Sequence, residues 1–341
     1  MNIQQALGEA ISGRDLKRED MQSVMQAIMT GEATAAQIAG FLVALRMKGE
    51  TVDELTAAAS VMRELATPVE LPHAIQAGLV DTCGTGGDGS RLFNVSTAVA
   101  FVVAAAGGKV AKHGNRSVSS SSGSADVFEA AGVKLDIGPD GVKRCIEEVG
   151  VGFMFAPGFH SAMKHAIGPR RELGQRTLFN LIGPLTNPAG AQNQVLGVFS
   201  PAWVRPLAEV LQALGSNRVM VVHGEDGLDE ISVAAKTQVA ELKEGQIKGY
   251  VIDPADYGLA HDSLKELQVT DAAESLWLIR SVFGGQPGPA RDMILINAAA
   301  ALCVCGLADD MKSGVSLAQQ AIDGGGAAVK LNALADLSAG L

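Results

Sequence analysis

The sequence is poor in aromatic residues, in cysteine and in long apolar runs. Phe, Trp and Tyr make up only 4% of 341 residues, and the four cysteines, Cys83, Cys145, Cys303 and Cys305, form no C-x-x-C pair. This spacing indicates neither a zinc site nor a disulfide framework, and reduced thiols are typical of cytoplasmic proteins. The longest apolar run, Ala98 to Ala106, is far shorter than the roughly 20 residues that a membrane span needs.

Positive charge is also scarce. The chain has 27 Lys and Arg against 37 Asp and Glu, which gives a net charge of −10. Proteins that bind nucleic acid over a broad surface are normally basic, so we expect no nucleic-acid partner. The N-terminal segment is polar and lacks the apolar region of a secretion signal. Together these features predict a cytoplasmic protein that does not associate with membranes.

Glycine, in contrast, is abundant at 40 residues, and the chain is longer than one hydrophobic core usually serves, which predicts two domains. Residues 1–70 have the pattern of helices, with capping-box sequences that begin at Thr34 and Thr51. From Leu79 onward, short apolar segments alternate with helical ones. This alternation predicts a largely parallel sheet covered by helices.

The predicted fold class is therefore α/β, with a small all-helical domain and a larger α/β domain around a mostly parallel central sheet. We expect the helical domain to span 1–70, joined by part of 160–190, where the strand signal is weak. The α/β domain then spans 71–341. Within it, Val233 to Asp253 alternates like antiparallel strands, and the tail from Ala290 is helical.

A glycine-rich segment, GTGGDG at residues 84–89, follows the first predicted strand. It fits the dinucleotide pattern G-x-G-x-x-G, but no helix begins inside it and no acid for a ribose occurs between Asp88 and Asp126. A P-loop motif is also absent from the sequence. The segment could be only a tight turn, or its backbone N–H groups could bind an anion. Asp88 favours the second interpretation if a cation or a sugar hydroxyl is also present.

Two polar segments downstream share this composition. Asn94 to Thr97 begins a predicted helix, where hydroxyls and free N–H groups either cap the helix or bind an anion. Lys112 to Ser124, KHGNRSVSSSSGS, combines cations, a histidine and many small donors after a second strand. It is either a solvated loop or a polyphosphate site.

Two adjacent acids, Asp229 and Glu230, follow a later strand. They could simply be solvated, but near a pyrophosphate they would suit Mg²⁺, which prefers oxygen ligands and substrate phosphates. Glu225 and Asp226 lie close enough in sequence to leave the exact ligands open.

These motifs, with R-x-L-G-x-R-T-x-F-N-x-x-GPLTNP and VHG-x-DGLDE, occur in the order typical of anthranilate phosphoribosyltransferases. The sequence resembles this family over essentially its whole length. The resemblance implies an Mg²⁺-dependent enzyme of tryptophan biosynthesis. Such an enzyme transfers the 5-phosphoribosyl group of phosphoribosyl pyrophosphate (PRPP) to the amine of anthranilate. It also implies a homodimer, with a site in the cleft between the two domains.

The resemblance assigns residues to each ligand. It implies PRPP contacts from three segments: Gly84, Gly87, Asp88, Asn94, Val95, Ser96, Thr97, Lys112, His113, Gly114, Asn115, Arg116, Ser117, Val118, Ser119, Ser120 and Ser124. It implies anthranilate contacts from Gly84, Asn115 and Arg170. The implied Mg²⁺ ligands are Ser96, Asp229 and Glu230.

Some of these roles have alternatives. Arg170 could hold the anthranilate carboxylate by a bidentate fork or form an interdomain salt bridge. His113 could be a general base, or only a hydrogen-bond or stacking partner. Two residues depart from the family pattern: Leu92 replaces a frequent threonine, and Ser121 replaces a frequent lysine.

Three other classes of protein compete with this interpretation. A pyrimidine nucleoside phosphorylase has the same general architecture but would use inorganic phosphate and a nucleoside, and the KHGN and GPLTNP segments favour the transferase. A nucleic-acid-binding relative is disfavoured by the net charge of −10. A purely structural protein would not need so many polar loops.

Overall fold

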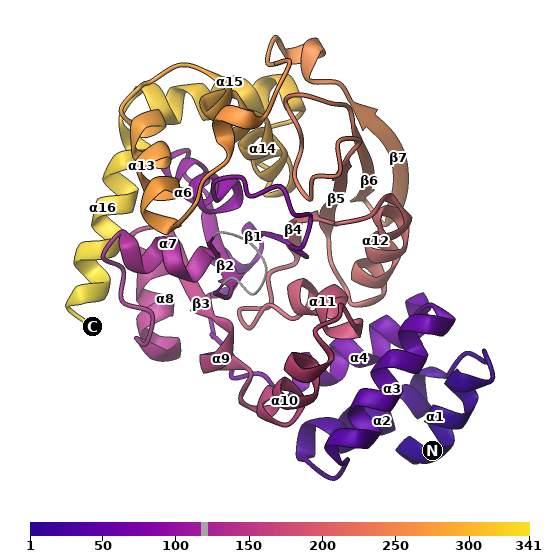
Figure 1. Ribbon diagram of the computed structural model, residues 1–341. Coiled ribbons are helices and arrows are strands. Elements are labelled where there is room, and N and C mark those ends of the chain that lie inside the picture. Colours follow the sequence, from indigo (N-terminus) through magenta and orange to yellow (C-terminus); the bar gives the residue numbers. More distant parts are fainter. Residues whose placement is uncertain (117–121) are drawn as a thin grey trace.

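The computed structural model describes residues 1–116 and 122–341. The expected PRPP contacts Ser117, Val118, Ser119 and Ser120, and the departure at Ser121, therefore lie outside the described residues. Figure 1 shows a helical bundle at one end of the molecule and a sheet flanked by helices in the rest of it. The predicted fold class, a helical domain plus an α/β domain, is confirmed.

The helical bundle consists of four helices: α1 (Ile3–Ile11), α2 (Arg18–Thr30), α3 (Ala35–Lys48) and α4 (Val52–Glu64). Thr34 and Thr51 form the predicted capping boxes at the start of α3 and α4. Two later helices pack against this bundle, α10 (Lys164–Leu173) on α2 and α3, and α11 (Leu178–Ile182) on α4. The segment that follows β3 thus returns to the N-terminal helices.

In the part of the chain that the structure describes, the central sheet has seven strands in the order β3-β2-β1-β4-β5-β6-β7. The strands are β1 (Leu79–Gly84), β2 (Lys109–Gly114), β3 (Val151–Phe155), β4 (Asn193–Gly197), β5 (Arg218–Gly224), β6 (Thr237–Lys243) and β7 (Gln246–Ile252). Pairing is parallel from β3 to β5, while β6 and β7 pair antiparallel. The predicted antiparallel segment is therefore the edge of the sheet.

Helices cover both faces of the sheet. The remaining helices are α5 (His73–Gln76), α6 (Val95–Ala105), α7 (Ser124–Ala130), α8 (Gly138–Glu148), α9 (Ala156–Phe159), α12 (Val204–Ala213), α13 (Ala272–Phe283), α14 (Pro289–Val304), α15 (Met311–Asp323) and α16 (Gly326–Ala339). Short 3₁₀ helices occupy Ser161–Met163, Gly183–Leu185, Pro201–Trp203, Pro254–Tyr257 and Lys265–Leu267. On one face α6 and α14 contact the strands, with α15 packed behind them; on the other, α8 covers β2 and β3, and α12 covers β5 and β6.

Alternate residues of each strand pack into different hydrophobic clusters, as the period of two requires. Val80 and Val110 pack with α6 and α14, whereas Leu79 and Ala111 pack with α8. The core under α12 is continuous with the core of the helical bundle, because residues such as Val221 join the cluster that contains Phe41. The bundle is therefore anchored directly to the sheet.

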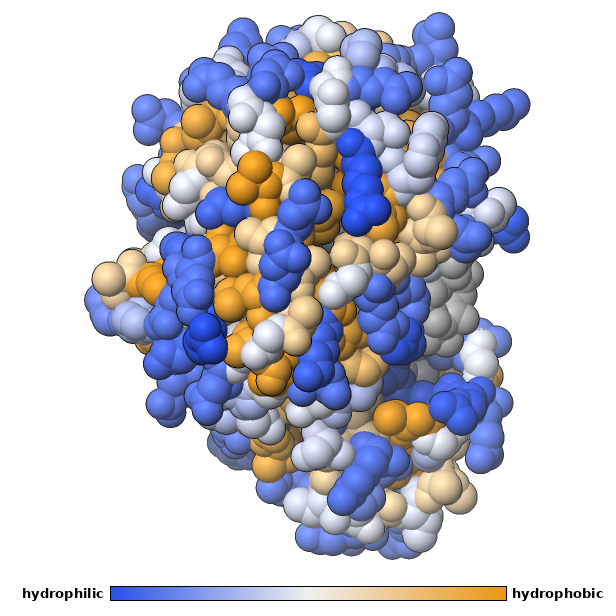
Figure 2. All heavy atoms as spheres, turned by 90° about the vertical axis from the view of Figure 1, so that its left-hand side faces the viewer, coloured by the Kyte–Doolittle hydropathy of each residue, from blue (hydrophilic) through white to orange (hydrophobic). Residues whose placement is uncertain are grey.

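No described helix is long and apolar enough to cross a membrane. Figure 2 shows the face formed by α7, α8, α13 and α16, where apolar residues gather in the middle among polar ones. Trp277 of α13 and Val329 of α16 are the large apolar side chains that these helices expose most.

Candidate active site

The polar motifs of the sequence meet at the carboxyl ends of the central strands. The glycine-rich segment follows β1, Lys112 and His113 lie near the end of β2, and Asp229 follows β5. The chain continues from β1 to β2 and β3 on one side, and from β4 to β5 on the other, so the strand order reverses next to β1. Ligands of open α/β sheets bind at such a switch point, beyond the carboxyl ends of the strands.

Asp229 lies across the ends of β1 and β4. Its Oδ2 accepts a hydrogen bond of 2.8 Å from the N–H of Gly86. The two strands end in the paired residues Gly84 and Gly197. A Cβ on Gly197 would lie 1.5 Å from the carbonyl oxygen of Asp229, and one on Gly84 would lie 2.3 Å from its Oδ2. Glycine at both positions is therefore what allows the acid to occupy this place.

Three carboxylates gather here. Burial and the charge of nearby Asp88 raise the pKa of Asp229. Burial and the charge of Asp229 raise the pKa of Glu230, which the Lys112 ammonium partly offsets. Like charges held together in a partly buried site favour a bound cation.

The donor set fits Mg²⁺ bound together with a phosphate. No group of three or more Asp, Glu, His or Cys among the described residues could hold an ion by itself. Asp229 and Glu230 with the hydroxyl of Ser96 could supply oxygen ligands, and Mg²⁺ commonly completes its shell with substrate phosphates and water. Asp226 points elsewhere, because its Oδ2 accepts a hydrogen bond of 2.6 Å from Ser232, and Glu225 is exposed.

Lys112 corrects one expectation. The sequence placed it in a loop after a strand, but it lies within β2 and its side chain is buried. Its Nζ donates to the carbonyl of Thr82 and, over 3.1 Å, to Oγ of Ser96. The ammonium therefore lies beneath the N-terminus of α6 and holds a predicted Mg²⁺ ligand in place.

Asn94 occupies the N-cap position of α6 but makes no side-chain cap bond. Instead its Oδ1 accepts hydrogen bonds from Ser122 over 2.7 Å and from Ser275 of α13 over 2.8 Å. Helix capping is thus not the role of this side chain. In the first turn of α6 the amides of Val95 and Thr97 donate to the carbonyls of Phe93 and Asn94, whereas the amide of Ser96 donates to Glu230.

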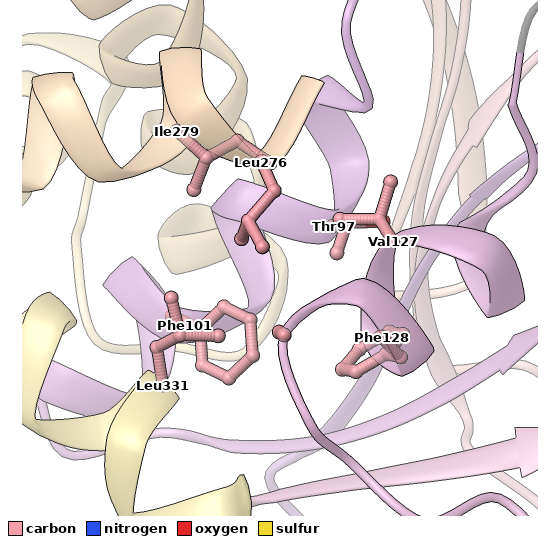
Figure 3. Close-up of a pocket in the computed structure, with 8 residues that line it drawn as sticks. Thr97, Phe101, Val127, Phe128, Leu276, Ile279 and Leu331 are labelled. Carbon is pink, nitrogen blue, oxygen red and sulfur yellow. The ribbon is translucent and has the colours of Figure 1, made fainter. Parts of the chain in front are cut away.

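The side chain of Thr97 points away from this site. It faces an apolar pocket lined by Phe101, Phe128, Leu276 and Leu331, as Figure 3 shows. The hydroxyl is buried and has no hydrogen-bond partner among the described residues. Any contact of Thr97 with PRPP would therefore involve its backbone.

Two buried histidines lie side by side below the site. The rings of His113 and His160 are tilted, with centroids 5.0 Å apart. Nε2 of His113 and both ring nitrogens of His160 have no close hydrogen-bond partner among the described residues. Burial lowers the pKa of His113 to about 3 and that of His160 to about 4. Both rings are therefore neutral at pH 7, and His113 is a poor general base.

The cations of the site differ in how they are held. Arg170 of α10 stacks over the ring of Phe179 at 5.0 Å, and no salt bridge to it is found in the described parts of the chain. Burial lowers its pKa. Arg116 is exposed and forms salt bridges with Asp126 and Glu129 of α7.

The other predicted contacts lie around these groups. Oδ1 of the exposed Asn115 accepts a hydrogen bond of 2.7 Å from the N–H of Arg116, and Ser124 begins α7 beside Gly114. Leu92, where the family often has threonine, packs at the edge of the apolar core and pairs with Gln268.

Sequence reasoning missed several residues of this region. Arg176 donates to the carbonyl of Gly87 and stacks on Phe199 at 4.4 Å. His160 and Ser275 carried no local signal. Asn187, in the GPLTNP segment, contacts β1 and β2, and only the motif itself could have drawn attention to it.

Residues 76–328 match the family described as "Glycosyl transferase family, a/b domain", and residues 4–66 match "Glycosyl transferase family, helical bundle domain". The fold and these two matches thus define a glycosyl transferase with a helical bundle domain and an a/b domain. The chain is 62% identical over 340 residues to the anthranilate phosphoribosyltransferase of Thioalkalivibrio sulfidiphilus (strain HL-EbGR7), with 99% of each chain covered. It therefore belongs to the anthranilate phosphoribosyltransferase family, which confirms the resemblance found in the sequence.

Solved structures agree. The crystal structure of the anthranilate phosphoribosyltransferase from Thermus thermophilus is 44% identical, with a TM-score of 0.91, over 98% of this chain and 99% of that one. The enzyme from Saccharomyces cerevisiae, solved in complex with PRPP and Mg, is 27% identical, with a TM-score of 0.89, over 99% and 98%.

Proposed function

We propose that this enzyme transfers the 5-phosphoribosyl group of PRPP to the amine of anthranilate, in tryptophan biosynthesis. The products are N-(5-phosphoribosyl)anthranilate and pyrophosphate. The observation that carries the proposal is one sheet edge with a glycine-rich loop, a helix N-terminus, paired carboxylates and an arginine that has no acidic partner among the described residues. The names of the full-length relatives add the substrates.

In the reaction a bond forms between the amine nitrogen and C1 of the ribose, while the bond from C1 to pyrophosphate breaks. The amine is neutral at pH 7 and needs no strong base, and it loses a proton as the product forms. Positive charge develops on the ribose and negative charge on the leaving group. We expect the N–H groups of the glycine-rich loop and of α6 to stabilise the negative charge on the leaving pyrophosphate, because such donors are already in position before the reaction.

Magnesium would be held by Ser96, Asp229 and Glu230. When bound, Mg²⁺ neutralises charge that develops on the departing pyrophosphate. Lys112 keeps Ser96 in position from below. The remaining contribution is orientation of the two reactants, which can remove roughly 7–11 kcal/mol of barrier.

For the acceptor, we propose that Arg170 holds the anthranilate carboxylate, supported by Asn115 and the backbone at Gly84. A partly buried guanidinium with a lowered pKa gains from a carboxylate partner. For the donor, we propose the PRPP contacts implied by the resemblance: Gly84, Gly87, Asp88, Asn94, Val95, Ser96, Thr97, Lys112, His113, Gly114, Asn115, Arg116, Ser117, Val118, Ser119, Ser120 and Ser124. Two of these contacts are restricted in kind. Thr97 could contact PRPP only through its backbone, because its side chain points away from the site, and the Lys112 ammonium lies beneath α6, where it bonds to Ser96.

We further propose a division into a helical domain of residues 1–70 with part of 160–190, and an α/β domain of 71–341. A homodimer is supported by exposed apolar side chains on the helical bundle, Ile11 and Met47, which are 72% and 83% exposed. A cytoplasmic location is supported by four free cysteines.

The test is the loss of anthranilate fluorescence after PRPP, Mg²⁺ and purified protein are combined, with each component omitted in turn. Loss that requires all components is the expected result. If the signal stays constant with a folded protein, the proposal is wrong, and phosphorolysis of a pyrimidine nucleoside becomes the next assay.

The metal assignment has its own control. Asp229→Asn with Glu230→Gln should raise the Mg²⁺ concentration needed for half-maximal rate. Glu225→Gln, in the same loop but exposed, should leave it unchanged. Equal titration curves for all three proteins would remove Asp229 and Glu230 from the metal site.

A further inference from the structure

The two central strands β1 and β2 stop pairing before they end. Both are six residues long, yet their pairing stops at Val80 and Val110. On their other sides β1 stays paired with β4, and β2 with β3, up to the glycines that end the strands, Gly84 and Gly114. The β1–β2 ladder in the middle of the sheet is thus interrupted toward the carboxyl ends, where the site lies, and this interruption is called the split.

Side chains satisfy the backbone groups inside the split. The N–H of His113 donates to Oδ1 of Asp81 over 3.2 Å, and the carbonyl of Ala111 accepts from Nδ2 of Asn187 over 2.8 Å. The two side chains also bond to each other, Nδ2 of Asn187 to Oδ2 of Asp81, over 2.7 Å. Oδ1 of Asn187 accepts from the N–H of Ala189. All these groups are buried, where an unpaired polar group is costly.

The split has a consequence for the site. Paired strands lie about 4.8 Å apart, which leaves no space for a side chain between their backbones. A carboxylate that replaces a backbone acceptor therefore keeps the strands further apart. The glycine-rich loop extends from β1, and the KHGN segment ends β2, so the same two side chains determine the distance between both segments.

We propose that Asp81 and Asn187 are positioning residues, which hold the carboxyl ends of β1 and β2 apart and set the spacing of the two segments that bind PRPP. The inference rests on the proposed function for the identity of the ligand. It also gives a role to the GPLTNP segment, whose asparagine crosses to both strands.

The hydrogen-bond pattern defines reciprocal variants. In Asp81→Asn the new amide oxygen accepts from only one of the two nitrogen donors of Asp81, His113 N–H or Asn187 Nδ2, and the NH₂ faces the other. In Asn187→Asp two carboxylates face each other. In the double variant the amide introduced at position 81 donates to the carboxylate introduced at position 187, while the amide oxygen still accepts from His113. The bond to Ala111 and the weak bond of 3.7 Å from Sγ of Cys83 to position 81 are then lost.

We expect each single variant to raise KM for PRPP by about 10- to 100-fold, because small displacements of positioned groups have effects of this size. KM for anthranilate should change less than about threefold, and the double variant should recover most of the loss. Single and double variants with unchanged KM for PRPP would overturn the inference, as would a double variant no better than either single one.

A buried asparagine at the opposite edge is the matched control. Nδ2 of Asn193 bridges the carbonyls of Ala77 and Leu79 at 3.1 and 3.0 Å, near the amino ends of the strands. Asn193→Asp also removes two buried hydrogen bonds and should destabilise the fold. KM for PRPP should stay at the wild-type value, which separates positioning from general loss of stability.

Hydrogen exchange gives a readout that does not depend on turnover. The amide of His113 should exchange faster in Asp81→Ala, which removes its acceptor, and stay protected in the double variant, where the amide oxygen at position 81 still accepts from it. Unchanged protection in Asp81→Ala would overturn the inference even if KM changed. Wild-type protein without transferase activity would refute the proposed function instead, and the exchange result would then decide whether Asp81 and Asn187 hold the split.

Discussion

Gly197 provides a direct test of the position of Asp229. It lies in a regular strand and has no left-handed backbone angle, so its conformation does not itself require glycine. The nearest atoms to an added Cβ all belong to Asp229, whose carbonyl oxygen would be 1.5 Å away. Gly197→Ala thus probes whether this carboxylate must lie across the strand ends.

The size of the effect follows from the geometry. The Asp229 backbone would have to withdraw by about 1.5 Å to reach 3.0 Å, the distance below which real Cβ contacts are essentially never found. A displacement of about 1 Å at an active site can cost roughly 100-fold in rate, so we expect kcat/KM to fall by about 100-fold or more. The hydrogen bond from Gly86 should also be lost, which raises the Mg²⁺ requirement.

The assay is steady-state kinetics over a range of Mg²⁺ concentrations, beside urea unfolding. Gly249→Ala is the control, since that strand glycine has no neighbour nearer than 3.8 Å to an added Cβ among the described residues. It should keep full activity. Overpacking alone destabilises by about 1–3 kcal/mol, so Gly197→Ala should remain folded while it loses activity. Activity within about threefold of wild type, with an unchanged Mg²⁺ titration, would refute this account of the site.

Other predictions concern charge. Arg170→Lys should raise KM for anthranilate about tenfold and leave KM for PRPP nearly unchanged, because lysine lacks the bidentate fork; equal effects on both would exclude the role. The folded protein holds the pKa values of His113 and His160 below the ordinary value near 6.5, so the unfolded chain binds more protons than the folded one once pH falls below 6.5. The free energy of unfolding is therefore highest above this pH and decreases below it. Urea unfolding should show a loss of about 1.4 kcal/mol per histidine at pH 5.5, and the His113→Gln variant a smaller loss. Lys48→Met should destabilise by about 3 kcal/mol, since it leaves the buried Glu54 without its cation at 2.9 Å; an unchanged urea midpoint would contradict this.

The sequence predicted those features of the fold that depend on local patterns. Thr34 and Thr51 were found because a capping box needs only residues three apart. The strands of the sheet were found because a buried parallel strand is a short apolar run between turns. The glycine-rich segment and the acidic pair at Asp229 could be placed together because each follows a strand, and parallel strands bring their carboxyl ends to the same side of the sheet.

Contacts between distant segments could not be predicted in this way. Asp81 and Asn187 are 106 residues apart in sequence, and neither has a neighbour that indicates the bond. The orientation of Thr97 depends on α7, α13 and α16 packing around α6, which no periodicity within α6 reveals. Lys112 was placed in a loop because a lysine inside a buried strand is rare, and its partners Thr82 and Ser96 come from other elements.

The polar residues of β1 and β2 explain why the middle of this sheet departs from the usual apolar pattern. Central parallel strands are normally close to continuous hydrophobic runs, yet Asp81, Thr82, Lys112 and His113 are all buried here. Burying polar groups is unfavourable unless they find partners, and two of the partners here, the N–H of His113 and the carbonyl of Thr82, are strand backbone groups. A sheet that kept its pairing to the end would be simpler to stabilise, but, on the proposal above, it would not give the two loops the spacing that PRPP requires. We therefore attribute these polar residues to the requirements of the site, as local departures from an otherwise consistent fold are expected to mark function.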